Sequence, residues 1–147
     1  MQSSKTAKAL TFAAIFTLAL IAGPPAKAAN RCSNATLSGS YSDQDTGYII
    51  GVGPFAGVNV DTFDGKGHIS ISGMSSLNGS VFPGAESGAY TVSSDCTGTY
   101  SVKDSENNVY NAYFVIDQSG NELQILITNP GTVIHCLARK QFPDDED

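Results

Sequence analysis

The chain has 147 residues, of which 8 are Lys or Arg and 14 are Asp or Glu, so its formal net charge at pH 7 is −6. This length suits one small domain, and 41% hydrophobic with 15% charged residues excludes a disordered acidic chain and a coiled coil. The acidic balance also argues against nucleic acid as a partner, because such binding depends on Lys and Arg side chains that neutralise phosphates.

Residues 1–28 have the parts of a secretory signal peptide. Lys5 and Lys8 give a basic start, residues 9–23 form an apolar run, and Ala26-Lys27-Ala28 supplies small residues for a cleavage site. The apolar run is shorter than the ~20 residues that a membrane-spanning helix needs. We therefore predict cleavage after Ala28, a secreted or periplasmic protein, and no membrane insertion after cleavage.

Beyond residue 37, apolar and polar residues alternate with a period close to two, and turn-forming sequences separate the segments. The pattern predicts eight strands, at residues 37–50, 55–63, 68–74, 87–93, 97–103, 109–117, 122–128 and 132–140. The Gly-rich stretch 73–88 is interpreted as a loop. The short connections favour an all-β fold, a closed eight-stranded antiparallel up-and-down β-barrel within residues 29–141. Residues 142–147 are expected to form an acidic disordered tail.

Alternation places Tyr90, Tyr100 and Phe114 on one face of the middle strands, which we expect to be the barrel interior. Together with Tyr41 on the first strand, these are candidates to line or fill the lumen. Glycines in the predicted strands would reopen space between them: Gly39, Gly57, Gly73 and Gly98. Because eight strands enclose room for side chains or for one small ligand, the sequence leaves both a filled core and a ligand cavity open.

The sixth and seventh predicted strands carry apolar residues on the face that should meet water. These residues are Tyr113, Val115 and Leu126. Exposed apolar patches are typical of interaction sites, and a second subunit is the simplest partner. We therefore expect a homo-oligomer, either a dimer or a trimer.

Few residues offer acid or base chemistry, and no motif for a hydrolase nucleophile, a zinc protease or a phosphate loop is present. His135 lies in the last predicted strand, where alternation does not decide its face. Pointing inward it would be an acid or base for a bound substrate, and pointing outward it would be a strand residue or a subunit contact. Glu86 is the other catalytic candidate, or else a solvated loop acid at the barrel rim. Acids in the first two predicted strands are interpreted as turn residues: Asp43, Asp45 and Asp61.

All three cysteines, Cys32, Cys96 and Cys136, follow the predicted cleavage site. An exported chain meets an oxidising compartment, so one disulfide and one free thiol are expected, and the residues alone leave the pairing open. No cysteine or histidine spacing suits zinc, and no carboxylate cluster lies nearby in the sequence. We expect neither a metal nor a cofactor.

Four stretches carry a resemblance to a known family. They are CSNATLSGSY at 32–41, FDGKG at 63–67, SSLNG at 75–79 and GAYTVSSDCTGT at 88–99. Together they resemble small secreted bacterial proteins described as allene oxide cyclase barrel-like, within the calycin-like barrels, over nearly all of the chain beyond the signal peptide. The resemblance implies an eight-stranded barrel with a lumen for an apolar substrate, and a Cys32–Cys96 bridge that leaves Cys136 free. No motif matches the catalytic positions of the plant cyclases, so none is carried over.

The expected function is binding of a small apolar molecule in the lumen, with His135 as its titrating partner. Two alternatives stay open. One is a structural or surface-associated secreted protein with a filled core, and the other is a cyclase or isomerase acting on a lipid- or terpenoid-like substrate. The lumen distinguishes them, because a cavity above ~300 Å³ indicates a ligand and a solid core excludes both binding functions.

Overall fold

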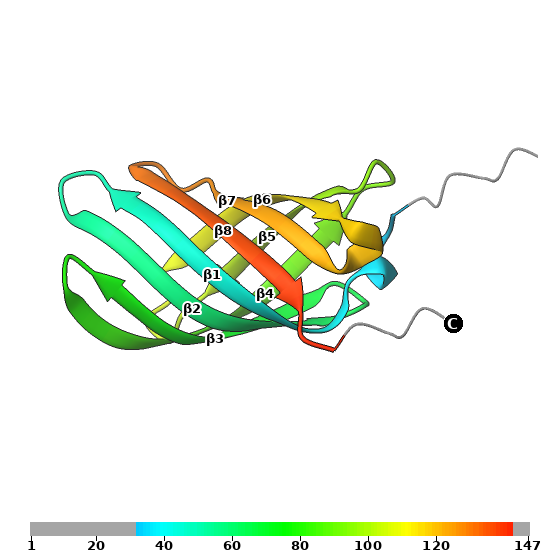
Figure 1. Cartoon of the computed structure of the whole chain (residues 1–147), viewed down its shortest axis with the longest axis horizontal. Coiled ribbons are helices and arrows are strands. Elements are labelled where there is room, and N and C mark those ends of the chain that lie inside the picture. The colour runs from blue at the N-terminus through cyan, green and yellow to red at the C-terminus, as the bar shows by residue number, and fades with distance from the viewer. Residues whose placement is uncertain (1–31, 143–147) are drawn as a thin grey trace, which may run out of the picture.

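The structure is a computed structural model, and it describes residues 32–142 (Figure 1). The predicted signal peptide, residues 1–28, and all of the predicted tail except Phe142 lie outside the described residues. Within residues 32–142, no helix is long and apolar enough to cross a membrane.

Eight antiparallel strands follow one another around a closed barrel. They are β1 (Ser38–Ile49), β2 (Gly53–Asp64), β3 (His68–Leu77), β4 (Ser80–Val92), β5 (Thr97–Lys103), β6 (Val109–Asp117), β7 (Glu122–Ile127) and β8 (Thr132–Lys140), with short 3-10 helices η1 (Asn34–Thr36) and η2 (Gln118–Gly120). The barrel closes where β8 pairs with β1, in a register that runs from Tyr41 opposite Lys140 to Ile49 opposite Thr132. The predicted all-β barrel and its strand order are confirmed.

The predicted loop at 73–88 is wrong. β3 continues to Leu77, β4 begins at Ser80, and the two-residue turn between them has positive φ angles, 49° at Asn78 and 87° at Gly79. Asn-Gly with two positive φ angles is the turn that best matches the twist of a tight hairpin. The alternation was hidden because inward positions here are small, with Gly73 opposite Gly84 across the two strands.

One end of the barrel is closed by aromatic packing. The Tyr41 and Tyr90 rings each meet the Phe63 ring edge to face, with centroid distances of 5.3 and 5.0 Å. The Tyr90 hydroxyl donates hydrogen bonds to the carbonyl oxygens of Asn34 at 2.9 Å and Leu37 at 3.1 Å. The N-terminal segment with η1 is thereby fixed across this end, which lies at the right in Figure 1.

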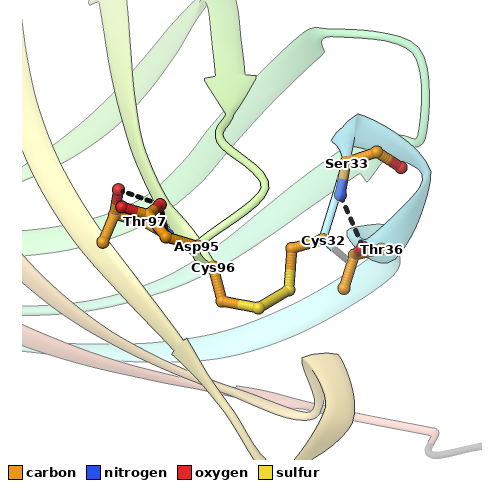
Figure 2. The surroundings of a disulfide bond; sticks show 6 residues. All are labelled: Cys32, Ser33, Thr36, Asp95, Cys96 and Thr97. Atoms are coloured by element: carbon orange, nitrogen blue, oxygen red, sulfur yellow. Dashed lines mark hydrogen bonds between the residues drawn. A yellow bond between two sulfur atoms is a disulfide. The ribbon is translucent and has the colours of Figure 1, made fainter. Parts of the chain in front are cut away.

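A disulfide also holds the N-terminal segment at the closed end. It joins Cys32, just before η1, to Cys96 in the turn between β4 and β5 (Figure 2). Beside it, the Asp95 carboxylate accepts hydrogen bonds from the backbone N–H and the hydroxyl of Thr97, at 3.1 and 2.8 Å. The expected Cys32–Cys96 pairing is confirmed, and Cys136 is free and buried. A disulfide is typical of proteins from an oxidising compartment.

The outer face of β6 and β7 carries the apolar side chains expected there. Tyr113 lies opposite Leu126 across the two strands, and both of these side chains and Val115 are exposed. These three residues form an uncovered apolar patch on the barrel wall.

Candidate functional site

The lumen contains a cavity of about 200 Å³, displaced toward the end that carries the β1–β2 and β3–β4 turns. Its apolar walls are Ile49, Phe55, Ile71, Leu77, Phe82, Val102, Ile127 and Ile134. At its rim, Phe82 is 41% exposed and Tyr110 is 38% exposed, so the cavity is reached from this end. The lumen is therefore filled at the closed end and hollow at the other.

The inner surface of β1 and β2 is acidic. Asp43 and Asp45 share a face with the buried Tyr41, because side chains two residues apart point to the same side of a strand. Asp43 is 7% exposed and Asp45 9%, and both line the cavity. Asp61 lies deeper, opposite Tyr41 in the register, and is fully buried. The interpretation of these three acids as turn residues is wrong, since all three lie inside strands and point into the barrel.

These carboxyl groups have few hydrogen-bond partners. Asp45 accepts a hydrogen bond of 2.6 Å from the side-chain amide of Asn59. Asp43 Oδ1 and both carboxyl oxygens of Asp61 have no hydrogen-bond partner within the described part of the chain. Because nearly all buried polar atoms in proteins are hydrogen-bonded, three unpartnered oxygens in one cluster require an explanation.

Burial and mutual repulsion keep protons on this cluster. Burial, then the charges of Asp61 and Asp45, raise the pKa of Asp43 to about 9. Burial, then the charges of Asp45 and Glu86, raise the pKa of Asp61 to about 8. Charged carboxylates in a low-dielectric site are costly without a counter-charge, so the barrel holds Asp43 and Asp61 protonated at neutral pH.

Cys136 lies on the inner face of β8, beside the same cluster. Its Sγ and single carboxyl oxygens of Asp43 and Asp45 lie within 4.8 Å of one another. Burial, followed by the charges of Asp45 and Asp43, raises the pKa of the Cys136 thiol, so it stays protonated. The expectation that no carboxylate cluster lies near a cysteine is wrong, because the strands bring together residues that are far apart in the sequence.

Two of the inner glycines make room for side chains and do not enlarge the cavity. A Cβ on Gly57 would lie 2.6 Å from Asp45 Oδ2, and a Cβ on Gly98 would collide with the Phe114 ring. Gly57 thus permits an acid to lie inside the barrel, and Gly98 permits a large ring in its core. The expectation that these glycines reopen the lumen is wrong.

The other predicted site residues lie in three places: the cavity wall, the packed core, and the outer face of β8. Tyr100 and Glu86 line the cavity, and the pKa of the half-buried Glu86 is raised by burial and by the charges of Asp104 and Asp45. The candidates Tyr41, Tyr90 and Phe114 are buried in the packed core.

His135 lies on the exposed outer face of β8, where its Nε2 is 3.1 Å from Gln124 Oε1. The inward residues of this strand are Ile134, Cys136 and Ala138. The hypothesis that His135 titrates in the lumen is therefore wrong, because its position in the alternation turns the ring away from the cavity.

A larger hollow of about 480 Å³ crosses the outer face of β1, β2 and β8. Its walls include outward-facing side chains such as Gln44, Val58 and Leu137. These three side chains are not buried, although Asp43, which is buried, also borders this hollow. The lumen cavity is the stronger candidate site because its walls enclose a ligand and its polar groups are desolvated.

No protein-family model matches this chain, and no curated protein matches it. Among solved structures, the chain is similar to a de novo designed fluorescence-activating β-barrel, with 11% sequence identity and a TM-score of 0.53. The match covers 72% of this chain and 94% of the designed chain. At this identity the likeness shows the fold alone, so the chain is similar to that protein as a β-barrel.

Proposed function

We propose that this protein binds a small molecule in its lumen, through the end that carries the β1–β2 and β3–β4 turns. The supporting observation is the 200 Å³ cavity with mainly aliphatic and aromatic walls. Each Å² of apolar ligand surface that leaves water contributes ~25 cal/mol, and these walls offer such surface. The volume does not reach the ~300 Å³ that the sequence-based test sets for a ligand cavity, although the lumen is not solid, so the proposed ligand is smaller than a drug-sized molecule.

The proposal includes the compartment and the family. The Cys32–Cys96 disulfide supports a secreted or periplasmic protein, as the predicted signal peptide does. The resemblance to allene oxide cyclase-like barrels supports a lumen that takes small, mainly apolar molecules. The filled-core alternative is less favoured, because the aromatic core occupies only the closed end of the barrel.

The test is a titration of the protein with 2-phenylethanol, a small neutral probe, followed by amide NMR. Saturable shifts are expected at residues that line the cavity. Ser75 points into the cavity from β3, so Ser75→Leu fills it and is expected to lower the affinity at least about tenfold. Ser70→Leu is the matched control, because Ser70 is exposed on the outer face of the same strand. Amide shifts that do not saturate with probe concentration would contradict lumen binding, and so would a Ser75→Leu affinity equal to that of wild type.

A second candidate function is isomerase or cyclase chemistry, which is favoured by a protonated carboxyl that lies beside a possible proton acceptor. Asp43 holds a proton at neutral pH, and Asp45 lies within reach of it. One carboxyl can then protonate a carbonyl oxygen while a neighbouring carboxylate removes an α-proton, which gives a neutral enol. Exchange of the α-protons of phenylacetone in D2O tests this chemistry. The catalysed exchange is expected to disappear in Asp43→Asn, and exchange at the buffer rate with wild-type protein would refute it.

A further inference from the structure

The cavity is strongly asymmetric in charge. Asp43, Asp45 and Glu86 line it, and Asp61 is packed beside them, opposite Ile71 of the cavity wall. Among its described lining residues, none is Lys, Arg or His. The ion pair between Arg139 and Glu122 involves none of these lumen acids, and its Arg139 side chain is 65% exposed. A cation is the species that this arrangement lacks.

The unpartnered oxygens indicate that a hydrogen-bond donor is missing. Asp43 is more than nine-tenths buried, lines the cavity, and has an Oδ1 without a partner in the described residues. A buried acceptor without a donor is destabilising, and water or a ligand N–H would relieve it. Asp43 lies in the cavity wall, so its carboxyl group is within reach of a bound molecule.

The rest of the cavity restricts the form of the cation. Aliphatic and aromatic side chains, such as Ile49, Phe55 and Leu77, form the wall between the acids and the rim. This wall suits the apolar part of a ligand. A primary ammonium group has three N–H donors for carboxylate oxygens, and an attached hydrocarbon would contact these walls. A bare metal ion would use the acids and leave the apolar walls in contact with water.

We propose that the acidic side of the lumen recognises the ammonium group of a small primary amine whose apolar body occupies the outer part of the cavity. This inference rests on the proposed function, lumen binding, and adds the class of ligand. The ammonium donates to Asp43 and Asp45 and supplies a positive charge, so the Asp43 carboxyl becomes ionised when the amine is bound. Asp61 and Glu86 are the other acidic groups beside this site.

A divalent cation is the competing occupant, because Asp43, Asp45 and Cys136 offer ligand atoms within 4.8 Å of one another. Thiolate, and not thiol, is the metal-binding form of cysteine. Burial and the neighbouring charges of Asp45 and Asp43 raise the pKa of the Cys136 thiol, which disfavours its use as a ligand. The geometry therefore favours the organic cation over the metal.

The experiment compares 2-phenylethylamine with 2-phenylethanol, its neutral counterpart, by calorimetry at neutral pH. The amine is expected to bind at least about tenfold more tightly than the alcohol. Asp43→Asn and Asp45→Asn are expected to remove most of this preference while alcohol binding stays within about threefold of wild type. Asp117→Asn is the matched control, because it makes the same side-chain change at an exposed position at the end of β6, outside the cavity.

The outcomes separate the two proposals. If the alcohol binds as tightly as the amine to wild-type protein, amine recognition is overturned and lumen binding stands. If neither molecule binds, lumen binding of molecules of this size fails, and amine recognition fails with it. A second titration uses Ca²⁺ and Zn²⁺ alone, and metal binding that displaces the amine and is lost in Asp43→Asn would assign the cluster to a metal. If circular dichroism shows that an Asn variant is unfolded, the ratio of the amine affinity to the alcohol affinity in wild-type protein decides the question.

Discussion

The buried carboxyls predict an unusual pH dependence of stability. In the folded barrel the pKa of Asp43 is raised to about 9 and that of Asp61 to about 8, by burial first and by neighbouring acids second. In the unfolded chain both groups ionise near pH ~3.9. Between these values the folded barrel keeps protons that the unfolded chain has lost. The free energy of unfolding must therefore be highest at mildly acidic pH and fall as the pH rises toward 8.

The magnitude follows from proton linkage. Each carboxyl that stays protonated only in the folded state removes about 1.4 kcal/mol of stability per pH unit. From about pH 5 to about pH 7, one such group lowers the free energy of unfolding by ~3 kcal/mol, a large part of the ~5–15 kcal/mol typical of a domain. Hydrogen bonds lower the pKa of exposed Asp64, Asp95 and Asp104. Their contribution is present above the unfolded pKa and lost only in more acidic solution, outside this window.

The assay is urea unfolding by circular dichroism at several pH values between about 5 and 8. Asp61→Asn is the informative variant, because Asp61 is fully buried and its carboxyl oxygens have no hydrogen-bond partner among residues 32–142. The substituted amide therefore loses no hydrogen bond to these residues, and it cannot ionise. Its slope is expected to be shallower by about 1.4 kcal/mol per pH unit, which makes it more stable than wild type above about pH 7. Asp117→Asn should keep the wild-type slope. Wild-type stability that is flat or rising over this range, or an Asp61→Asn slope equal to wild type, would refute the reasoning.

Three further predictions concern the cysteines and the outer face. Replacing Cys32 and Cys96 together by Ala should lower the free energy of unfolding by ~4 kcal/mol in the chain-entropy model, because 64 residues separate them, and urea unfolding measures it. The Cys136 thiol should react with a disulfide reagent only after unfolding, because it is buried with a raised pKa; prompt reaction in native protein would contradict this. Light scattering at about 100 μM should give more than the monomer mass, and Leu126→Lys should restore that mass; a monomeric wild type would refute self-association through this face.

The strands were predictable because one face of each must be apolar. Tyr90, Tyr100 and Phe114 were placed inside by alternation alone, and all three are buried. The β3–β4 hairpin was missed because glycine occupies inward positions, and a glycine carries no hydrophobic signal. Alternation thus fails where the interior lacks large side chains, which is also where a barrel has room for something else.

The acidic cluster was not predicted, although a signal for it was present. Asp43 and Asp45 lie two and four residues after Tyr41, so placing Tyr41 inside a continuous strand also places them inside. Residue type alone favours turn positions for them, because acids are rarely buried and often occupy turns. The predicted strand at 37–50 already contains both acids, and β1 runs from Ser38 to Ile49 without a break, so the alternation that places Tyr41 inside applies to them as well. The pairing of these acids with Asp61 and Cys136 depends on the register between strands, which a single sequence does not contain.

His135 marks the limit of the alternation argument. β8 has aliphatic residues on both faces, with Val133 exposed outside and Ile134 buried inside, so neither face is distinguished by hydrophobicity. The decision comes from the pairing of β8 with β1, which sets His135 opposite Thr46 and Cys136 opposite Asp45. The strand register therefore places His135, the expected base, on the outer face and places the Cys136 thiol beside the lumen acids.

The two ends of the barrel divide stability from recognition. At the closed end, the disulfide, the rings around Phe63 and the hydrogen bonds of Tyr90 fix the N-terminal segment, so polar groups there are satisfied by the chain itself. Beside the cavity, Asp43 and Asp61 keep oxygens that no described residue satisfies. A barrel selected for stability alone would gain by replacing these acids with apolar side chains. The closed end contributes stability that offsets the cost of desolvating these acids. A bound cation would recover part of that cost, which links the pH dependence of stability to the ligand that we infer.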